Sequence, residues 1–115
     1  MAGMIIDFHT HVFPPSVITR RDQYVARDAT MATLFFDPRS AMATAEELLA
    51  AMNEAEVDVA VVMGMGWTDP DLASEINDYL LESAARHPAR LVAFCSVNPA
   101  WGDAALREVE RCARL

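Results

Sequence analysis

Three short apolar runs, separated by segments with helical periodicity, constrain the fold of this 115-residue chain more than any other feature. The runs are residues 4–8 (MIIDF), 57–63 (VDVAVVM) and 91–97 (LVAFCSV). Their apolar residues are nearly continuous instead of alternating, which is typical of strands covered on both faces, as in parallel sheets. The last two runs begin 34 residues apart, at 57 and 91, a normal length for a βαβ repeat.

The segments after these runs predict helices. Thr44 and Glu47 form a capping box before one apolar pattern, and Asp69 before Pro70 gives a second helix its N-cap and first residue. The expected helices span 44–55, 69–84 and 103–113, and the third carries an apolar stripe of Leu106, Val109, Cys112 and Ala113. The order βαβαβα predicts one α/β domain of parallel strands with right-handed crossovers.

The first repeat is longer than the others because residues 12–43 are inserted between the first strand and its helix. A loop of this length in a compact domain is usually functional or disordered. This one contains Tyr24, Phe35 and Phe36. We therefore expect an ordered, lid-like segment with one or two short helices.

Composition excludes several classes of function. The formal net charge is −8 and no basic patch is present, which disfavours a nucleic-acid or anionic-membrane partner. No apolar stretch approaches a transmembrane length, and the first residues lack a basic signal-peptide region, so we expect a cytoplasmic protein. The sequence has no lysine, which rules out Schiff-base chemistry within it. Cys95 and Cys112 are expected to be buried, reduced thiols.

A His-x-His pair follows the first apolar run. Alternation along a strand places Asp7, His9 and His11 on one side. Two imidazoles at this spacing can ligate one metal ion, and the carboxyl ends of strands are where α/β barrels keep their active sites. We predict metal ligation by His9 and His11, with an incidental surface pair as the alternative.

Other polar residues near the strand ends have competing interpretations. Asp7 either accepts a hydrogen bond from a metal ligand and orients it, or is a polar group satisfied elsewhere. Asn98 either contacts a substrate or forms a turn before proline. Asp69 and Asp71 lie at the correct edge, but helix capping already explains them. His87 is expected at the opposite edge, as a cation near a helix C-terminus.

Residues 4–15 (MIIDFHTHVFPP) resemble the opening of the amidohydrolase-2 family, and the similarity continues through 45–63, 77–82 and 90–99. Members of this family are metal-dependent (β/α)8 barrels that include amide and lactone hydrolases and non-oxidative decarboxylases. The resemblance covers about the first three βα units of that fold. It implies a TIM-barrel architecture of which residues 1–115 form the N-terminal part.

The resemblance also implies a site. His9 and His11 would be first-strand ligands of a divalent ion, usually zinc, acting on a small-molecule substrate. The remaining ligands, and the main acid/base residue, would come from later strands beyond Leu115. Decarboxylases of the family bind the substrate carboxylate with a lid arginine. The candidates here are Arg20, Arg21, Arg27 and Arg39, and we take Arg39 together with Asn98 as substrate-binding.

A complete barrel needs roughly 250 residues, and three βα units leave two unpaired strand edges. We expect either the remaining part of the barrel or a homo-oligomer to cover them. The expected reaction is hydrolysis of a C–N or C–O bond by metal-activated water, or a related decarboxylation, with little turnover by the isolated chain. One alternative is a catalytically dead half-barrel that serves as an interaction module. A small flavodoxin-like domain is another, but Gly64 and Gly66 do not make a phosphate-binding glycine loop.

Overall fold

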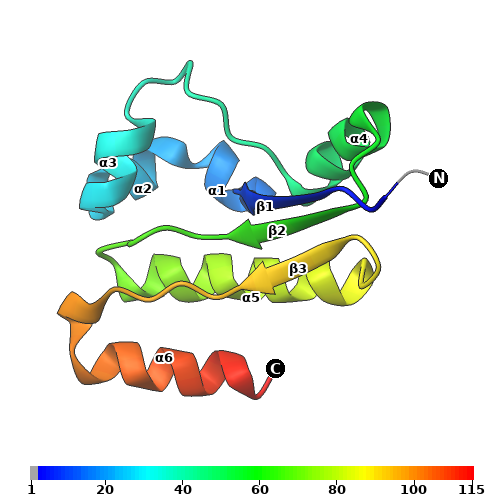
Figure 1. Cartoon of the computed structure of the whole chain (residues 1–115). Helices are drawn as coiled ribbons and strands as arrows, with labels where there is room; N and C mark the ends of the chain where they lie inside the picture. The colour runs from blue at the N-terminus through cyan, green and yellow to red at the C-terminus, as the bar shows by residue number, and fades with distance from the viewer. Residues whose placement is uncertain (1–2) are drawn as a thin grey trace.

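A three-stranded parallel sheet with the order β1–β2–β3 lies at the centre of the computed structural model, which describes residues 3–115 (Figure 1). The strands are β1 (Ile6–Thr10), β2 (Val59–Met63) and β3 (Leu91–Phe94). The predicted α/β class, with parallel strands linked by helices, is confirmed. The helices are α1 (Pro15–Thr19), α2 (Arg21–Arg27), α3 (Ala29–Phe35), α4 (Ala45–Ala55), α5 (Pro70–Arg86), the 3-10 helix η1 (Pro99–Trp101) and α6 (Asp103–Ala113).

The strand boundaries differ from the predicted runs because pairing, and not hydrophobicity, defines them. The backbone N–H groups of Asp58 and Val59 both donate to the carbonyl of Ile5, and β1 begins only after this point. At its other end, β1 extends to Thr10 instead of ending at Phe8, because Thr10 pairs with Val62, and this brings His9 inside the strand. β3 ends at Phe94, earlier than predicted, and the N–H of Ser96 just beyond it donates to the side chain of Asn77.

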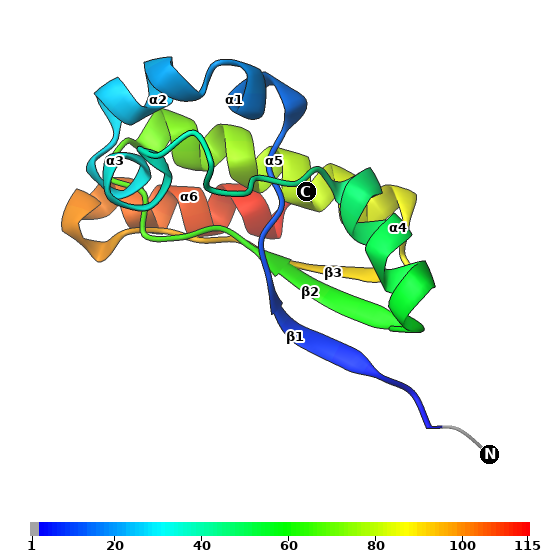
Figure 2. The same ribbon diagram turned by 90° about the horizontal axis from the view of Figure 1, so that it is seen from above.

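The helices lie on one side of the sheet (Figure 2). On that side, Ala60 and Val62 of β2 and Leu91 of β3 are buried in a single apolar cluster. On the other side, Val92 and Phe94 of β3 are exposed. The sheet thus has one covered face and one open face, although its nearly continuous apolar runs are typical of parallel strands that are buried on both faces.

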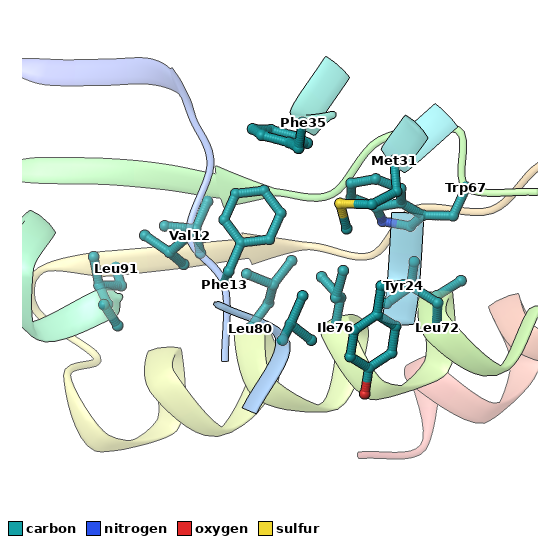
Figure 3. Close-up of a cluster of buried hydrophobic side chains, with 14 of the residues drawn as sticks. Val12, Phe13, Tyr24, Met31, Phe35, Trp67, Leu72, Ile76, Leu80 and Leu91 are labelled. Carbon is teal, nitrogen blue, oxygen red and sulfur yellow. The ribbon is translucent and has the colours of Figure 1, made fainter. Parts of the chain in front are cut away.

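The inserted segment forms three helices, not one or two, and supplies much of the core. Val12, Phe13, Tyr24, Met31 and Phe35 pack with Trp67 against the α5 side chains Leu72, Ile76 and Leu80 (Figure 3). Phe13 contacts both Phe35 and Trp67 edge-on, with ring centroids 5.1 and 6.2 Å apart. The segment is therefore part of the folded core, and its burial explains its aromatic content.

α6 packs on α5 through a different face from the one that its sequence pattern indicates. Ala105, Glu108 and Cys112 are buried, whereas Leu106 and Val109 remain exposed. Of the predicted stripe, the structure confirms burial for Cys112 alone. Cys95 is half-buried; both thiols are free, and burial raises the pKa of each.

Glu108 replaces apolar contacts at the α5–α6 interface with a polar network. Its carboxylate accepts hydrogen bonds from Asn77 Nδ2 (2.9 Å), from Ser74 Oγ (3.1 Å) and from Arg111, whose Nε lies 2.7 Å away. Arg111 also pairs with Asp78 at 2.7 Å. These contacts, the Arg111 guanidinium first, lower the pKa of Glu108 to about 2. Every polar group of the network has a partner, which makes the interface specific.

We predict that Glu108 makes folding stability depend on acid pH. Because its pKa is about 2 in the folded state and lies near 4.5 without these partners, its contribution is present above pH 4.5 and is lost as pH falls toward 2. Glu108→Gln should remove that part of the pH dependence and lower the free energy of unfolding by roughly 2–3 kcal/mol at pH 7. Urea denaturation between pH 2 and 7 measures both effects. The exposed neighbour Glu110→Gln is the control, and equal pH profiles for the two variants would contradict the assignment.

Gly64, directly after β2, lies so close to the side chains of Trp67 and Ser96 that a larger residue would crowd them. A Cβ at this position would lie 3.0 Å from Trp67 Nε1 and 3.3 Å from Ser96 Cβ. Gly66, two residues later, has open space at the same position. Gly64→Ala should therefore destabilise the protein by about 1–3 kcal/mol through overpacking, whereas Gly66→Ala should change stability little. Thermal unfolding of the two variants tests this, and an equal loss in both would refute the steric explanation.

Candidate metal centre

The two histidines predicted as ligands meet at the carboxyl end of β1. The Nε2 atoms of His9 and His11 lie 3.0 Å apart, and the ring planes are inclined at 76°. His9 is exposed and His11 is half-buried. This contact is a hydrogen bond between the two rings, and it brings two nitrogens that could ligate a metal ion to one place at the end of the strand.

Backbone groups of β2 orient this pair. His11 Nδ1 lies 2.9 Å from the carbonyl oxygen of Met63, and a carbonyl only accepts, so Nδ1 carries the hydrogen. In the neutral ring, Nε2 is then left with its lone pair, the state that a metal ion requires. The hydroxyl of Thr10 donates to the carbonyl of Val61 at 2.7 Å and fixes the backbone between the two histidines. Neither acceptor could be found from sequence, because both depend on the β1–β2 register.

The spacing of the nitrogens is compatible with one divalent ion. The Nε2 atoms are close enough together for both to bind one ion. Within residues 3–115, no group of three or more His, Cys, Asp or Glu side chains is placed to hold a metal. The described residues therefore offer two nitrogen ligands at this point and no third ligand beside them.

Asp7 and Asn98 have defined partners in the structure. Asp7 Oδ1 accepts from the backbone N–H of His9 at 3.1 Å, so it contacts the backbone of His9 and not its ring. Asn98 Oδ1 accepts from the N–H of Ala100 at 3.0 Å, and its Nδ2 donates to the carbonyl of Trp67 at 3.2 Å. Asn98 therefore caps η1 and joins two loops that follow strands.

The candidate arginines of the inserted segment are all engaged. Arg39 pairs with Asp37 at 2.7 Å on the surface, and this contact lowers the pKa of Asp37. Arg21 donates to the Asp37 carbonyl at 3.0 Å. Arg20 donates to the Tyr24 hydroxyl at 3.4 Å, and Arg27 lies over the Tyr24 ring and binds Asp69 at 2.7 Å.

His87, Asp69 and Asp71 occupy the places predicted from helix signals. His87 caps the C-terminus of α5, at the opposite end of the helix from Asp69. The carboxylate of Asp69 accepts from the N–H of Asp71 at 2.9 Å as the N-cap. These residues are accounted for by the helix and do not join the histidine pair.

The inserted segment is fixed to the loop after β2 by a buried carboxylate that the sequence interpretation missed. Asp28 accepts from the N–H of Met31 at 2.8 Å, capping α3, and from the N–H of Asp69 at 2.8 Å. Glu75 of α5 accepts from the Tyr24 hydroxyl at 2.8 Å and from Ser16 Oγ at 3.0 Å. An Asp three residues before Met31 is a capping signal, but its second partner depends on tertiary structure. The segment is a fixed wall beside the carboxyl ends of the strands.

Comparison with solved structures identifies the fold. The chain superposes on 5-carboxyvanillate decarboxylase from Novosphingobium aromaticivorans DSM 12444, solved with manganese and 4-hydroxy-3-methoxy-5-nitrobenzoic acid, with a TM-score of 0.72 and 20% identity, over 96% of this chain and 38% of that one. The corresponding enzyme from Sphingomonas paucimobilis gives the same TM-score and identity, with 96% and 39% covered. The 2,6-dihydroxybenzoate decarboxylase from Rhizobium gives a TM-score of 0.59 and 20% identity, over 98% of this chain and 36% of that one.

These similarities establish the fold. The chain has the fold of a part of these decarboxylase structures, and the predicted arrangement of three parallel strands with helices is confirmed. The chain spans somewhat more than a third of the length of these structures. No protein-family model and no curated protein matches it. No helix within residues 3–115 is both long and apolar enough to span a membrane.

We predict that Asp28 anchors the wall beside the site. Asp28→Ala leaves two backbone donors without their acceptor in a buried position, which should lower the free energy of unfolding by roughly 2–4 kcal/mol. Hydrogen exchange should accelerate first in α3 and at Asp69. The exposed Asp22→Ala is the matched control, and unchanged exchange in α3 of the Asp28 variant would disprove the anchoring role.

Proposed function

We propose that this chain provides the first-strand portion of a divalent-metal centre in an enzyme that acts on a small carboxylic acid. The observation that carries the proposal is the 3.0 Å approach of the His9 and His11 Nε2 atoms at the carboxyl end of a parallel strand. The fold shared with metal-containing decarboxylases supports it. We favour non-oxidative decarboxylation because several of the similar structures are named as decarboxylases. Hydrolysis of a C–N or C–O bond is the second candidate, since another structure of the same fold is named as an amidohydrolase.

A bound divalent ion would polarise the substrate carboxylate or carbonyl and lower the pKa of a bound water. His9 and His11 would hold the ion through Nε2. The Met63 carbonyl keeps the His11 hydrogen on Nδ1, so that this ring binds without first losing a proton at Nε2. The hydrogen bond from the His9 backbone N–H to Asp7 would restrain the backbone at His9. The wall held by Asp28 would limit water on one side of the site.

We favour manganese over the zinc expected from the sequence resemblance, because manganese is the ion in the complex of the 5-carboxyvanillate decarboxylase that this fold resembles. Further ligands and the acid/base residue would have to come from βα units beyond the three that the structure describes.

The test is metal binding by the purified protein and by matched histidine variants. In equilibrium dialysis against MnCl2 or ZnCl2, the wild type and His87→Ala should bind the metal with the same modest affinity, whereas His9→Ala/His11→Ala should bind it at least ten-fold more weakly. Both exposed or half-buried histidines can be removed without opening the core, and circular dichroism checks the fold. Metal retention by the double variant equal to that of His87→Ala would refute the proposal.

A decarboxylase assay distinguishes the proposed enzyme from the alternative, a catalytically inactive interaction module. With 5-carboxyvanillate and 2,6-dihydroxybenzoate as probes, carbon dioxide release that depends on metal and on His9 and His11 supports the decarboxylase. We expect the 115-residue chain alone to show little or no turnover, because a two-ligand site holds an ion weakly. A protein with no bound metal and no turnover in its longest expressed form would instead favour the inactive half-barrel.

A further inference from the structure

The fold brings the two cysteines of the chain, Cys95 and Cys112, into side-chain contact. Cys95 directly follows β3, and Cys112 lies in the last turn of α6. The segment after β3 runs beside α6 in both views (Figure 1, Figure 2), and a hydrogen bond links the two thiols. Both thiols are free. Two thiols in contact, on different elements of the fold, are the arrangement from which a disulfide can form.

The two thiols differ in their access to solvent. Cys95 is half-buried, whereas Cys112 is 7% exposed, so a small oxidant in solution meets Cys95 first. Cys112 Sγ also lies 3.7 Å from Glu108 Oε2. If that thiol lost its hydrogen, the Glu108 carboxylate would keep its hydrogen bonds from Asn77 and Arg111. Joining the two sulfurs therefore leaves no buried carboxylate without a partner.

The surroundings of the pair make its oxidation slow and its oxidised form stable. Burial is the largest cause that raises the pKa of both thiols, and it helps to bring that of Cys112 to about 12. The carboxylates of Glu108 and Asp78 also raise the pKa of Cys95, and the Arg111 guanidinium opposes them. Few thiolates are then present at neutral pH, and the thiolate is the reacting form. For the same reason the reduced pair is not stabilised by ionisation, which makes a disulfide difficult to reduce once it has formed.

We propose that Cys95 and Cys112 form an oxidative modification site, at which a peroxide joins the two residues in a disulfide. Hydrogen peroxide first oxidises the Cys95 sulfur to a sulfenic acid, and the O–O bond breaks with release of one water. The Cys112 sulfur then attacks the Cys95 sulfur, and the S–O bond breaks as the hydroxyl leaves with the Cys112 proton as a second water. Two thiols and one peroxide thus give one disulfide and two waters. The inference does not depend on the proposed metal centre.

The disulfide would attach α6 covalently to the end of β3. It closes residues 95–112 into a loop, which stabilises a fold mainly by restricting the unfolded chain. In the reduced protein, the hydrogen bonds of Glu108 join α6 to α5. Because these contacts depend on an ionised carboxylate, oxidation would give α6 an attachment that acid does not remove.

The test treats the purified protein with hydrogen peroxide, blocks the remaining thiols with N-ethylmaleimide in denaturant and maps the peptides by mass spectrometry. We expect one peptide pair, linked through Cys95 and Cys112 within a single chain, that accumulates over minutes to hours at neutral pH. The oxidised protein should melt about 5–15 °C above the reduced protein, and reduction with a phosphine should reverse the shift.

Cys95→Ser and Cys112→Ala are the control variants. They are needed because peroxide also oxidises methionine, of which the chain has seven. Neither variant should gain stability on treatment, and Cys112→Ala should carry a sulfenic acid at Cys95 that dimedone traps. Circular dichroism before and after treatment checks that each protein is folded.

Three outcomes would overturn the proposal. One is a treated, folded protein in which N-ethylmaleimide still labels both cysteines. A second is a disulfide that joins two chains and is absent within one chain. The third is an equal rise in melting temperature for the wild type and for Cys95→Ser, because the disulfide would then not be its cause.

Discussion

The parallel pairing of β1 with β2 is the interaction on which the rest of the structure depends. It joins Ile6 to Val59 across more than fifty residues, beginning where the Ile5 carbonyl accepts from Asp58 and Val59. The pairing sets the distance from His11 to the Met63 carbonyl and thereby the orientation of the ring. It also closes the long insertion into a loop whose ends are fixed, so that its aromatic side chains can pack on α5.

The insertion and the histidine pair are linked through the loop after β2. That loop contains Gly64, which allows Trp67 to pack closely, and it ends at Asp69, which binds both Asp28 and Arg27 of the insertion. A substitution in this loop would therefore affect both the position of the inserted segment and the end of β2, whose Met63 carbonyl orients the His11 ring. The arrangement keeps the side chains around the proposed metal site on rigid elements, which is what a preorganised centre needs.

Charge and hydrophobicity are distributed unusually in α6, and this explains the one clear failure of the helical pattern. A stripe with Leu106 and Val109 predicts burial, and the structure buries Glu108 instead. The network with Asn77, Ser74 and Arg111 compensates the carboxylate, so the helix can contact α5 through its polar side. The hydrophobic pattern therefore identifies the apolar face of the helix correctly. It does not show whether another element covers that face.

The sequence by itself determined the order of strands and helices, the capping box at Thr44, the N-cap at Asp69 and the pairing of two histidines with a strand end, because each depends on residues within a few positions. Tertiary structure alone decided the strand boundaries, the third helix of the insertion, the two partners of Asp28 and the tautomer of His11. Each of these depends on hydrogen bonds or packing between segments far apart in the chain. Local propensity carries no information about such contacts.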